Sequence, residues 1–80
     1  MSLPEAHLDI TEENCPMTFV RTKLCLERLD DGQILRVRLR DGEPLENVPR
    51  AVEDHGHEIL SLNRVASDVF ELIVKKRATP

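Results

Sequence analysis

The sequence has very few aromatic residues: Phe19 and Phe70 are the only two, and tryptophan and tyrosine are absent. A surface that binds single-stranded nucleic acid by base stacking needs several aromatic side chains. The charge balance points the same way, because 11 basic residues stand against 15 acidic ones, a formal net charge of −4. Non-specific binding to nucleic acid depends on an excess of lysine and arginine that displaces counterions. Both observations argue against a nucleic-acid partner.

Long apolar runs are also missing, since none exceeds four residues. A membrane-spanning helix needs about 20 consecutive apolar residues, so we expect no membrane span. Residues 1–7 lack the basic start and the apolar run of a signal peptide, and we expect a cytoplasmic protein. The only cysteines are Cys15 and Cys25, which a reducing cytosol would keep free. Their separation fits neither a C-x-x-C redox pair nor a zinc knuckle, and we expect neither a metal nor a cofactor.

Eighty residues are enough for one domain with a modest core, because a chain this short buries only about 60% of its unfolded surface. Hydrophobic residues make up 40% of the chain, as in ordinary globular proteins. We expect a single domain over 1–80 with an ordered core at about 7–76. There is no room for a large enclosed pocket. We therefore expect any reactive site to lie near the surface, with a partner protein forming part of its walls.

Strand and helix patterns alternate along the first half of the chain. A short, partly apolar stretch at 7–10 predicts an edge strand. Good helix formers then follow Cys15-Pro16 to about Leu29 and predict a first helix, which ends at Asp31-Gly32. Strict alternation over 34–40 predicts a half-buried strand with one polar face.

The second half predicts one more helix and a hairpin. Pro44 and Pro49 bracket an irregular start to the second helix, which Gly56 would end. Strands at 57–62 and 68–75 are joined by a short link at 63–67 and predict a β-hairpin. A sheet with one polar face must bury its other face under both helices. We therefore expect an α+β fold: a two-layer sandwich of order βαβαββ, with two helices on one face of a four-stranded mixed sheet.

Cys15 stands at the start of the predicted first helix. Pro16 suits the first helical position, because its missing N–H would have had no intrahelical partner there. The N–H groups of Met17 and Thr18 would then point toward the cap, with a helix dipole of roughly +0.5 charge. Both effects favour the thiolate, which is the nucleophile, and would stabilise a persulfide anion in the same way. Cys15 is therefore the candidate reactive residue.

The alternative for Cys15 is the ordinary role of a free cysteine, which is that of a small buried apolar residue. Glu12 and Glu13 lie just upstream and would raise the pKa of the thiol if they sit close to it. Cys25 lies in the middle of the helix, away from its amino end, and is expected to fill space. His55 and His57 could hold a metal only if they converged with Cys15, which nothing in the spacing requires.

Basic side chains form a second candidate site, for docking of a partner. The three arginines of the alternating strand, Arg36, Arg38 and Arg40, share its polar face and could bind an acidic protein or RNA. Arg21 and Lys23 on the first helix could add to such a surface. The alternative is a solvated strand face whose charges discourage pairing between sheet edges.

An ordered set of residues resembles the TusA/SirA-like sulfur-carrier family. The set consists of Leu8-Asp9, Cys15-Pro16 after five further residues, Gly32 before an apolar strand, Val48-Pro49, and Gly56-His57-Glu58. The resemblance covers roughly residues 8–77. It implies the βαβαββ two-layer fold and a cysteine that takes sulfane sulfur as a persulfide, which maps onto Cys15, with Pro16 as the proline that follows. It also implies protein partners: a cysteine desulfurase or rhodanese-like donor, and a protein acceptor.

The chain departs from the family pattern at two places. Cys15-Pro16-Met17-Thr18 replaces Cys-Pro-x-Pro, and Thr11-Glu12 replaces the usual Arg-Gly pair. These changes indicate a divergent subgroup rather than the tRNA-thiolation relay itself. The leading hypothesis is a sulfur-relay protein, a sulfurtransferase in the broad sense. The alternative is a non-catalytic binding or regulatory module that keeps the fold and has lost the relay.

Overall fold

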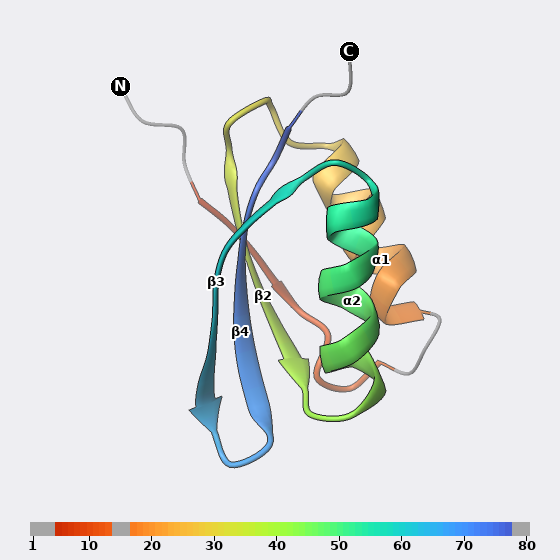
Figure 1. Cartoon of the computed structure of the whole chain (residues 1–80), viewed down its shortest axis with the longest axis vertical. Coiled ribbons are helices and arrows are strands. Elements are labelled where there is room, and N and C mark those ends of the chain that lie inside the picture. Colours follow the sequence, from red (N-terminus) through yellow and green to blue (C-terminus); the bar gives the residue numbers. More distant parts are fainter. Residues whose placement is uncertain (1–4, 14–16, 78–80) are drawn as a thin grey trace.

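The computed structural model describes residues 5–13 and 17–77. Four strands and two helices follow one another in the predicted order βαβαββ (Figure 1). They are β1 (Ala6–Asp9), α1 (Met17–Glu27), β2 (Ile34–Arg40), α2 (Glu43–Asp54), β3 (Glu58–Ala66) and β4 (Val69–Lys75). The predicted fold class is confirmed.

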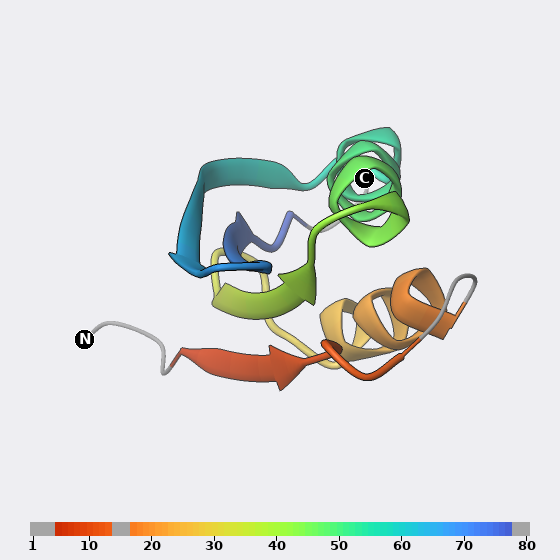
Figure 2. The ribbon, with the colours of Figure 1, turned by 90° about the horizontal axis from the view of Figure 1, so that it is seen from below.

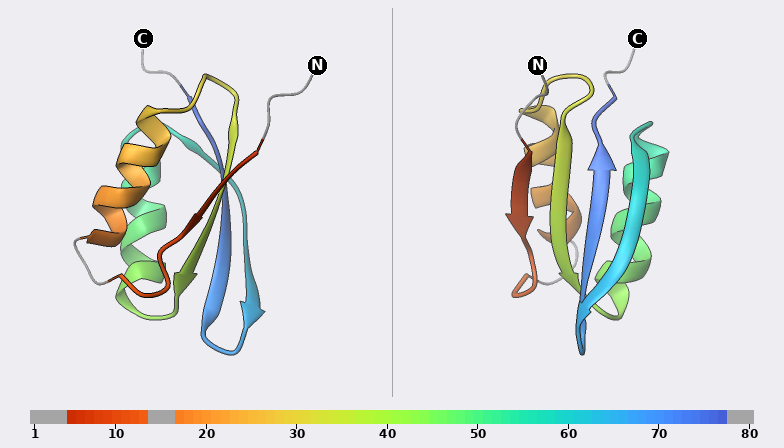
Figure 3. Two further views of the ribbon diagram at one scale, coloured as in Figure 1. Left: turned by 180° about the vertical axis from the view of Figure 1, so that it is seen from behind. Right: turned by 90° about the vertical axis from the view of Figure 1, so that its left-hand side faces the viewer.

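The four strands form one mixed sheet in the order β1-β2-β4-β3. β1 runs parallel to β2, whereas β4 pairs antiparallel with both β2 and β3. Both helices lie on the same face of this sheet, and the other face is open (Figures 2 and 3). β1 is an edge strand, as predicted, and β3 forms the opposite edge.

The core lies between the sheet and the helices. β2 alternates as predicted, with Leu35, Val37 and Leu39 fully buried and the arginines on the open face. The neighbouring strand β4 contributes Leu72 and Val74, and α2 contributes Val48 and Val52. Ile10 and Leu26 complete the set of buried apolar side chains within 5–13 and 17–77. The two central strands therefore supply more than half of these side chains.

The predicted irregular start to the second helix is wrong. α2 begins at Glu43, with Pro44 in its first turn, and Pro49 lies inside the helix. A proline inside a helix removes one backbone hydrogen bond, but Val48 and Val52 lie one turn apart and are buried on either side of it. Burial of the helix face that carries Val48 and Val52 offsets the backbone hydrogen bond that Pro49 removes. The predicted stop is confirmed, since Gly56 takes a positive φ of 88° just after the helix.

The predicted link at 63–67 is also wrong, because β3 continues to Ala66. Asn63 and Arg64 pair with Glu71 and Phe70 of β4, and the Arg64 guanidinium lies 5.2 Å from the centre of the Phe70 ring. The register shifts twice along β3, between 59 and 61 and between 64 and 66. Each shift leaves one extra residue on β3, as in a β-bulge. The hairpin itself is confirmed.

Candidate functional site

The predicted reactive residue, Cys15, lies outside the described residues, and so does Pro16. The described part of the helix that follows them begins at Met17. Met17 is 46% exposed, whereas the next residue, Thr18, is fully buried. The N-terminal cap at Cys15 therefore remains a prediction, adjacent to an observed helix start.

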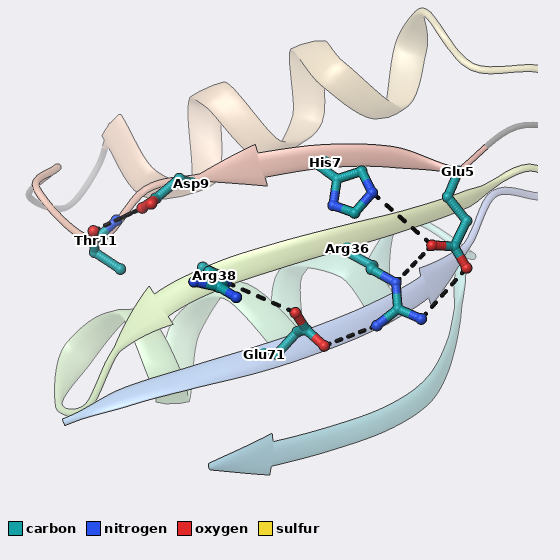
Figure 4. A network of polar contacts seen from close by, with 7 residues as sticks. All are labelled: Glu5, His7, Asp9, Thr11, Arg36, Arg38 and Glu71. Atoms are coloured by element: carbon teal, nitrogen blue, oxygen red, sulfur yellow. Dashed lines mark hydrogen bonds and ion pairs between the residues drawn. The ribbon is translucent and has the colours of Figure 1, made fainter. Parts of the chain in front are cut away.

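The chain that leads from β1 toward Cys15 is fixed to the sheet. The Asp9 carboxylate accepts hydrogen bonds from the backbone N–H of Thr11 (2.9 Å) and from its hydroxyl (2.7 Å), as Figure 4 shows. These bonds lower the pKa of Asp9. Between them, Ile10 is buried, and its N–H donates to the carbonyl of Arg38 on β2 (2.9 Å). Asp9 thus acts as a turn-forming residue at the end of β1.

We expect Asp9→Ala to destabilise the protein in a pH-dependent way. A carboxyl group whose pKa is lowered by folding adds stability above its unfolded pKa, near 3.8, and loses it as the pH falls through the lower folded value. The difference in free energy of unfolding between wild type and variant should therefore be present at about pH 6 and shrink at about pH 2.5. Urea unfolding at both pH values measures it. Asp9→Asn, which keeps a turn-forming amide, should lose less, and an equal difference at both pH values would contradict this role.

One of the two acidic residues upstream of Cys15 has its own partner. The Arg21 guanidinium of α1 reaches back to the Glu13 carboxylate at 2.5 Å. An ion pair of this kind partly cancels the field that Glu13 would exert on a neighbouring thiol. Arg21 therefore contributes to the surroundings of the helix start rather than to a free basic surface.

The solvent side of α1 carries an apolar stripe, formed by Met17, Val20 and Leu24. Their exposed fractions are 46%, 37% and 51%. They lie three and four residues apart, so they share one face of the helix. The opposite, core-facing side is made by Thr18, Thr22 and Leu26 instead. The α1 apolar stripe thus begins two residues after Cys15 and runs along the helix surface.

Sequence reasoning missed the two buried threonines. The Thr22 hydroxyl donates to the carbonyl of Thr18 at 2.8 Å, which satisfies the hydroxyl inside the helix. A threonine bonded in this way exposes only its methyl group to its neighbours and packs like a small apolar residue. A hydrophobicity pattern counts threonine as polar, so it does not identify these two residues as part of the core.

The three strand arginines lie on the open face of the sheet, as predicted, but each has an acidic partner. Arg36 contacts Glu5 (2.6 Å) and Glu71 (2.9 Å), and Arg38 lies 3.8 Å from Glu71 (Figure 4). The Arg36 guanidinium lowers the pKa of the Glu5 carboxyl. Arg40 lies 3.8 Å from Asp68. The face is therefore a mixed network of charges rather than a basic patch.

Cys25 is half-buried and packs against the core, in agreement with the space-filling role predicted for it. Burial raises the pKa of its thiol. We therefore expect Cys25 to alkylate more slowly in the folded protein than in urea, because only the thiolate reacts. Iodoacetamide labelling of Cys15→Ser, in which Cys25 is the remaining thiol, measures both rates. A folded-state rate equal to the rate in urea would contradict this expectation.

The two histidines near the end of α2 make different contacts. The His55 ring stacks on Phe19, with the ring centres 5.5 Å apart. The Nδ1 atom of His57 accepts a hydrogen bond from the backbone N–H of Arg77 at 3.1 Å. Within residues 5–13 and 17–77, no three His, Cys, Asp or Glu side chains are grouped as ligands for a metal ion. No helix in the described part of the chain has the length and apolar character needed to cross a membrane.

Several known proteins are similar to this chain. An archaeal protein from Archaeoglobus fulgidus, named "Putative sulfur carrier protein", is 44% identical over 70 residues, which cover 88% of this chain and 80% of the relative. A protein of the same description from Methanocaldococcus jannaschii is 36% identical over 70 residues, covering 86% and 91%. The crystal structure of a SirA-like protein from Desulfitobacterium hafniense superposes with a TM-score of 0.77 and covers 91% of this chain and 99% of the other, at 19% identity. The last comparison establishes similarity of fold.

The sequence model of the family described as Sulfurtransferase TusA matches residues 6–76. This match runs from the first residue of β1 to the residue after β4, so it includes all four strands and both helices. Together with the 44% identity to the archaeal relative, it establishes the family predicted from the sequence. The chain belongs to the TusA sulfurtransferase family.

Proposed function

We propose that this protein carries sulfane sulfur as a persulfide on Cys15, between a sulfur-donor protein and a protein acceptor. The observation that carries the proposal is the position of Cys15 two residues before the start of α1, in a chain that belongs to the TusA family. The relatives named as sulfur carriers support the same role. A reducing cytoplasm, which keeps both cysteines free, is the compartment that suits this chemistry.

The transfer needs no cofactor, because a sulfur atom moves from one cysteine thiolate to another without a net change of oxidation state. The Cys15 thiolate attacks the outer sulfur of a donor cysteine persulfide. A new S–S bond forms between Cys15 and this outer sulfur while the S–S bond of the donor breaks. The inner sulfur, which belongs to the donor cysteine, leaves as a thiolate. Delivery to the acceptor is the same displacement, with the persulfide of Cys15 as the donor.

The amino end of α1 supports both halves of this cycle. Its first backbone N–H groups have no intrahelical acceptor, and the dipole places partial positive charge at this end. An anion at a helix start gains about 0.3–1 kcal/mol from this field when exposed. Thiolate and persulfide both carry one negative charge, so the helix favours the attacking form and the loaded form alike.

We assign donor docking to the α1 apolar stripe rather than to the strand arginines. Met17, Val20 and Leu24 are exposed and follow Cys15 directly along the helix, so a protein that reaches Cys15 would cover them. Lys23 lies on the same helix and could orient an acidic surface of the donor, whereas Arg21 is already paired with Glu13. The strand arginines are poorer candidates, because carboxylates of the protein itself already neutralise them.

The proposal is tested by loading the protein with sulfur. The protein is incubated with a cysteine desulfurase and cysteine, and its intact mass is measured without reductant. A gain of about 32 Da, one sulfur atom, is expected, and dithiothreitol should remove it. If the protein binds the desulfurase but gains no mass, the chain is a binding module that has kept the fold without the relay.

A further inference from the structure

A cavity of about 160 Å³ lies between the two helices, the start of β3 and the end of β4. Its walls come from α1, from the end of α2, from His57 before β3, and from Lys76 and Arg77 after β4. Figure 1 shows why these segments meet: the C-terminal ends of both helices, the start of β3 and the end of β4 lie at the same end of the molecule. Three segments far apart in sequence, within 19–27, 52–57 and 76–77, therefore build one concave site.

The cavity is basic in a protein whose net charge is −4. Lys23, Lys76 and Arg77 line it together with the Glu27 carboxylate, and the Glu58 carboxylate outside the lining pairs with Arg77, so one positive charge remains in excess. Lys23 makes no hydrogen bond or ion pair with any residue of the ranges 5–13 and 17–77. This concentration of positive charge favours an anion.

The donors in the cavity are only partly used. The Lys76 ammonium donates one hydrogen bond, to the carbonyl of Leu26 at 2.6 Å, and an ammonium has three N–H groups. Arg77 contacts Glu58 through one terminal nitrogen, at 2.5 Å. Because Nδ1 of His57 accepts the bond from Arg77, its ring proton lies on Nε2 and adds another donor. An incoming oxyanion would therefore find several donors at hand.

One wall of the cavity is apolar. It contains Leu26 and Val52, each 2% exposed, and the Phe19 ring, which stacks on His55. A space of 160 Å³ holds on the order of ten water molecules, which is the room taken by a ligand of about ten non-hydrogen atoms. The wall therefore suits a ligand with a flat or aliphatic part beside its charged group.

We propose that this cavity binds a small organic anion. Its carboxylate or phosphate lies against Lys23, Lys76 and Arg77, and its apolar part lies on the Phe19 side. The proposal rests on these described residues and not on the sulfur chemistry of Cys15. Specificity follows from both halves, because the charge selects anions and the apolar wall selects organic anions over inorganic ones.

The test uses benzoate as the probe, with two matched ligands. Benzamide has the same shape without the charge, and inorganic phosphate has charge without the apolar ring. Amide shifts in ¹⁵N–¹H spectra of the whole protein should saturate with benzoate at a Kd on the order of 1 mM or tighter. The shifts should centre on His55, His57 and Lys76. Benzamide and phosphate should each bind at least about tenfold more weakly.

A pair of charge variants separates the cavity from general attraction to a positive surface. Lys23→Gln should weaken benzoate binding about three- to tenfold, whereas Lys75→Gln, the same change one residue before the cavity-lining Lys76, should not. The proposal is overturned if benzamide or phosphate binds as tightly as benzoate, if the two variants respond alike, or if the shifts do not saturate.

Discussion

Replacing Cys15 with serine is expected to abolish the sulfur adduct completely. A serine hydroxyl cannot be the sulfur nucleophile, and it cannot hold a persulfide. Cys25 should not take over, because it is half-buried in the last turn of α1, far from its amino end, and its thiol pKa is raised. After incubation with desulfurase and cysteine, intact mass should show the unmodified variant, where wild type gains about 32 Da.

Cys25→Ser is the matched control for this experiment. It removes the other thiol and should keep the adduct at the level of wild type. Both variants must show the far-UV spectrum of the folded protein, so that loss of loading is not loss of fold. Sulfur found on Cys15→Ser, or lost in Cys25→Ser, would move the reactive site to Cys25 and end the proposal for Cys15.

Leu72→Ala is expected to cause the largest loss of stability. Leu72 is fully buried on the central strand β4, and truncating a buried leucine costs about 2–5 kcal/mol. A domain of this size has a total free energy of unfolding of roughly 4–12 kcal/mol, from about 0.05–0.15 kcal/mol per residue. The variant should therefore lose a large fraction of its stability. Urea unfolding followed by circular dichroism measures the change.

Leu62 provides a control for this experiment within the same sheet. It lies directly opposite Leu72 on β3, but it is 40% exposed. Leu62→Ala makes the same chemical change and should cost less than half as much, because less apolar surface leaves the core. Equal losses would mean that the hairpin edge is as tightly packed as the centre of the sheet.

The sequence predicted most of the fold because the clearest patterns come from elements with one buried face. Both ends of β2 were predicted correctly. Apolar side chains alternate with arginines along it, so only the apolar side of the strand can face the core. The order βαβαββ and the two-layer arrangement followed from the same reasoning. Gly56 marked the end of α2, because its positive φ suits glycine.

Other features depend on contacts that a linear pattern does not contain. Asn63 and Arg64 look like loop residues, yet they belong to β3, because backbone pairing with β4 does not require apolar side chains. Pro49 is tolerated inside α2 because the valines beside it are buried. The acidic partners of the strand arginines were missed as well, although Glu71 lies opposite Arg38 in the sheet register. That register becomes known only once the strands are paired.

The two register shifts on β3 limit what the exposed edge of the sheet can do. Leu60 and Val65, one at each shift, are 47% and 46% exposed, so this edge is apolar enough to attract another chain. Between the shifts, only Ser61–Arg64 keeps an unbroken ladder with β4. A strand of another molecule could form regular backbone hydrogen bonds with no more than these four residues, because each shift interrupts the register. The β3 edge is thereby poorly suited to fibre-like stacking, in which copies of this strand would have to pair along their whole length.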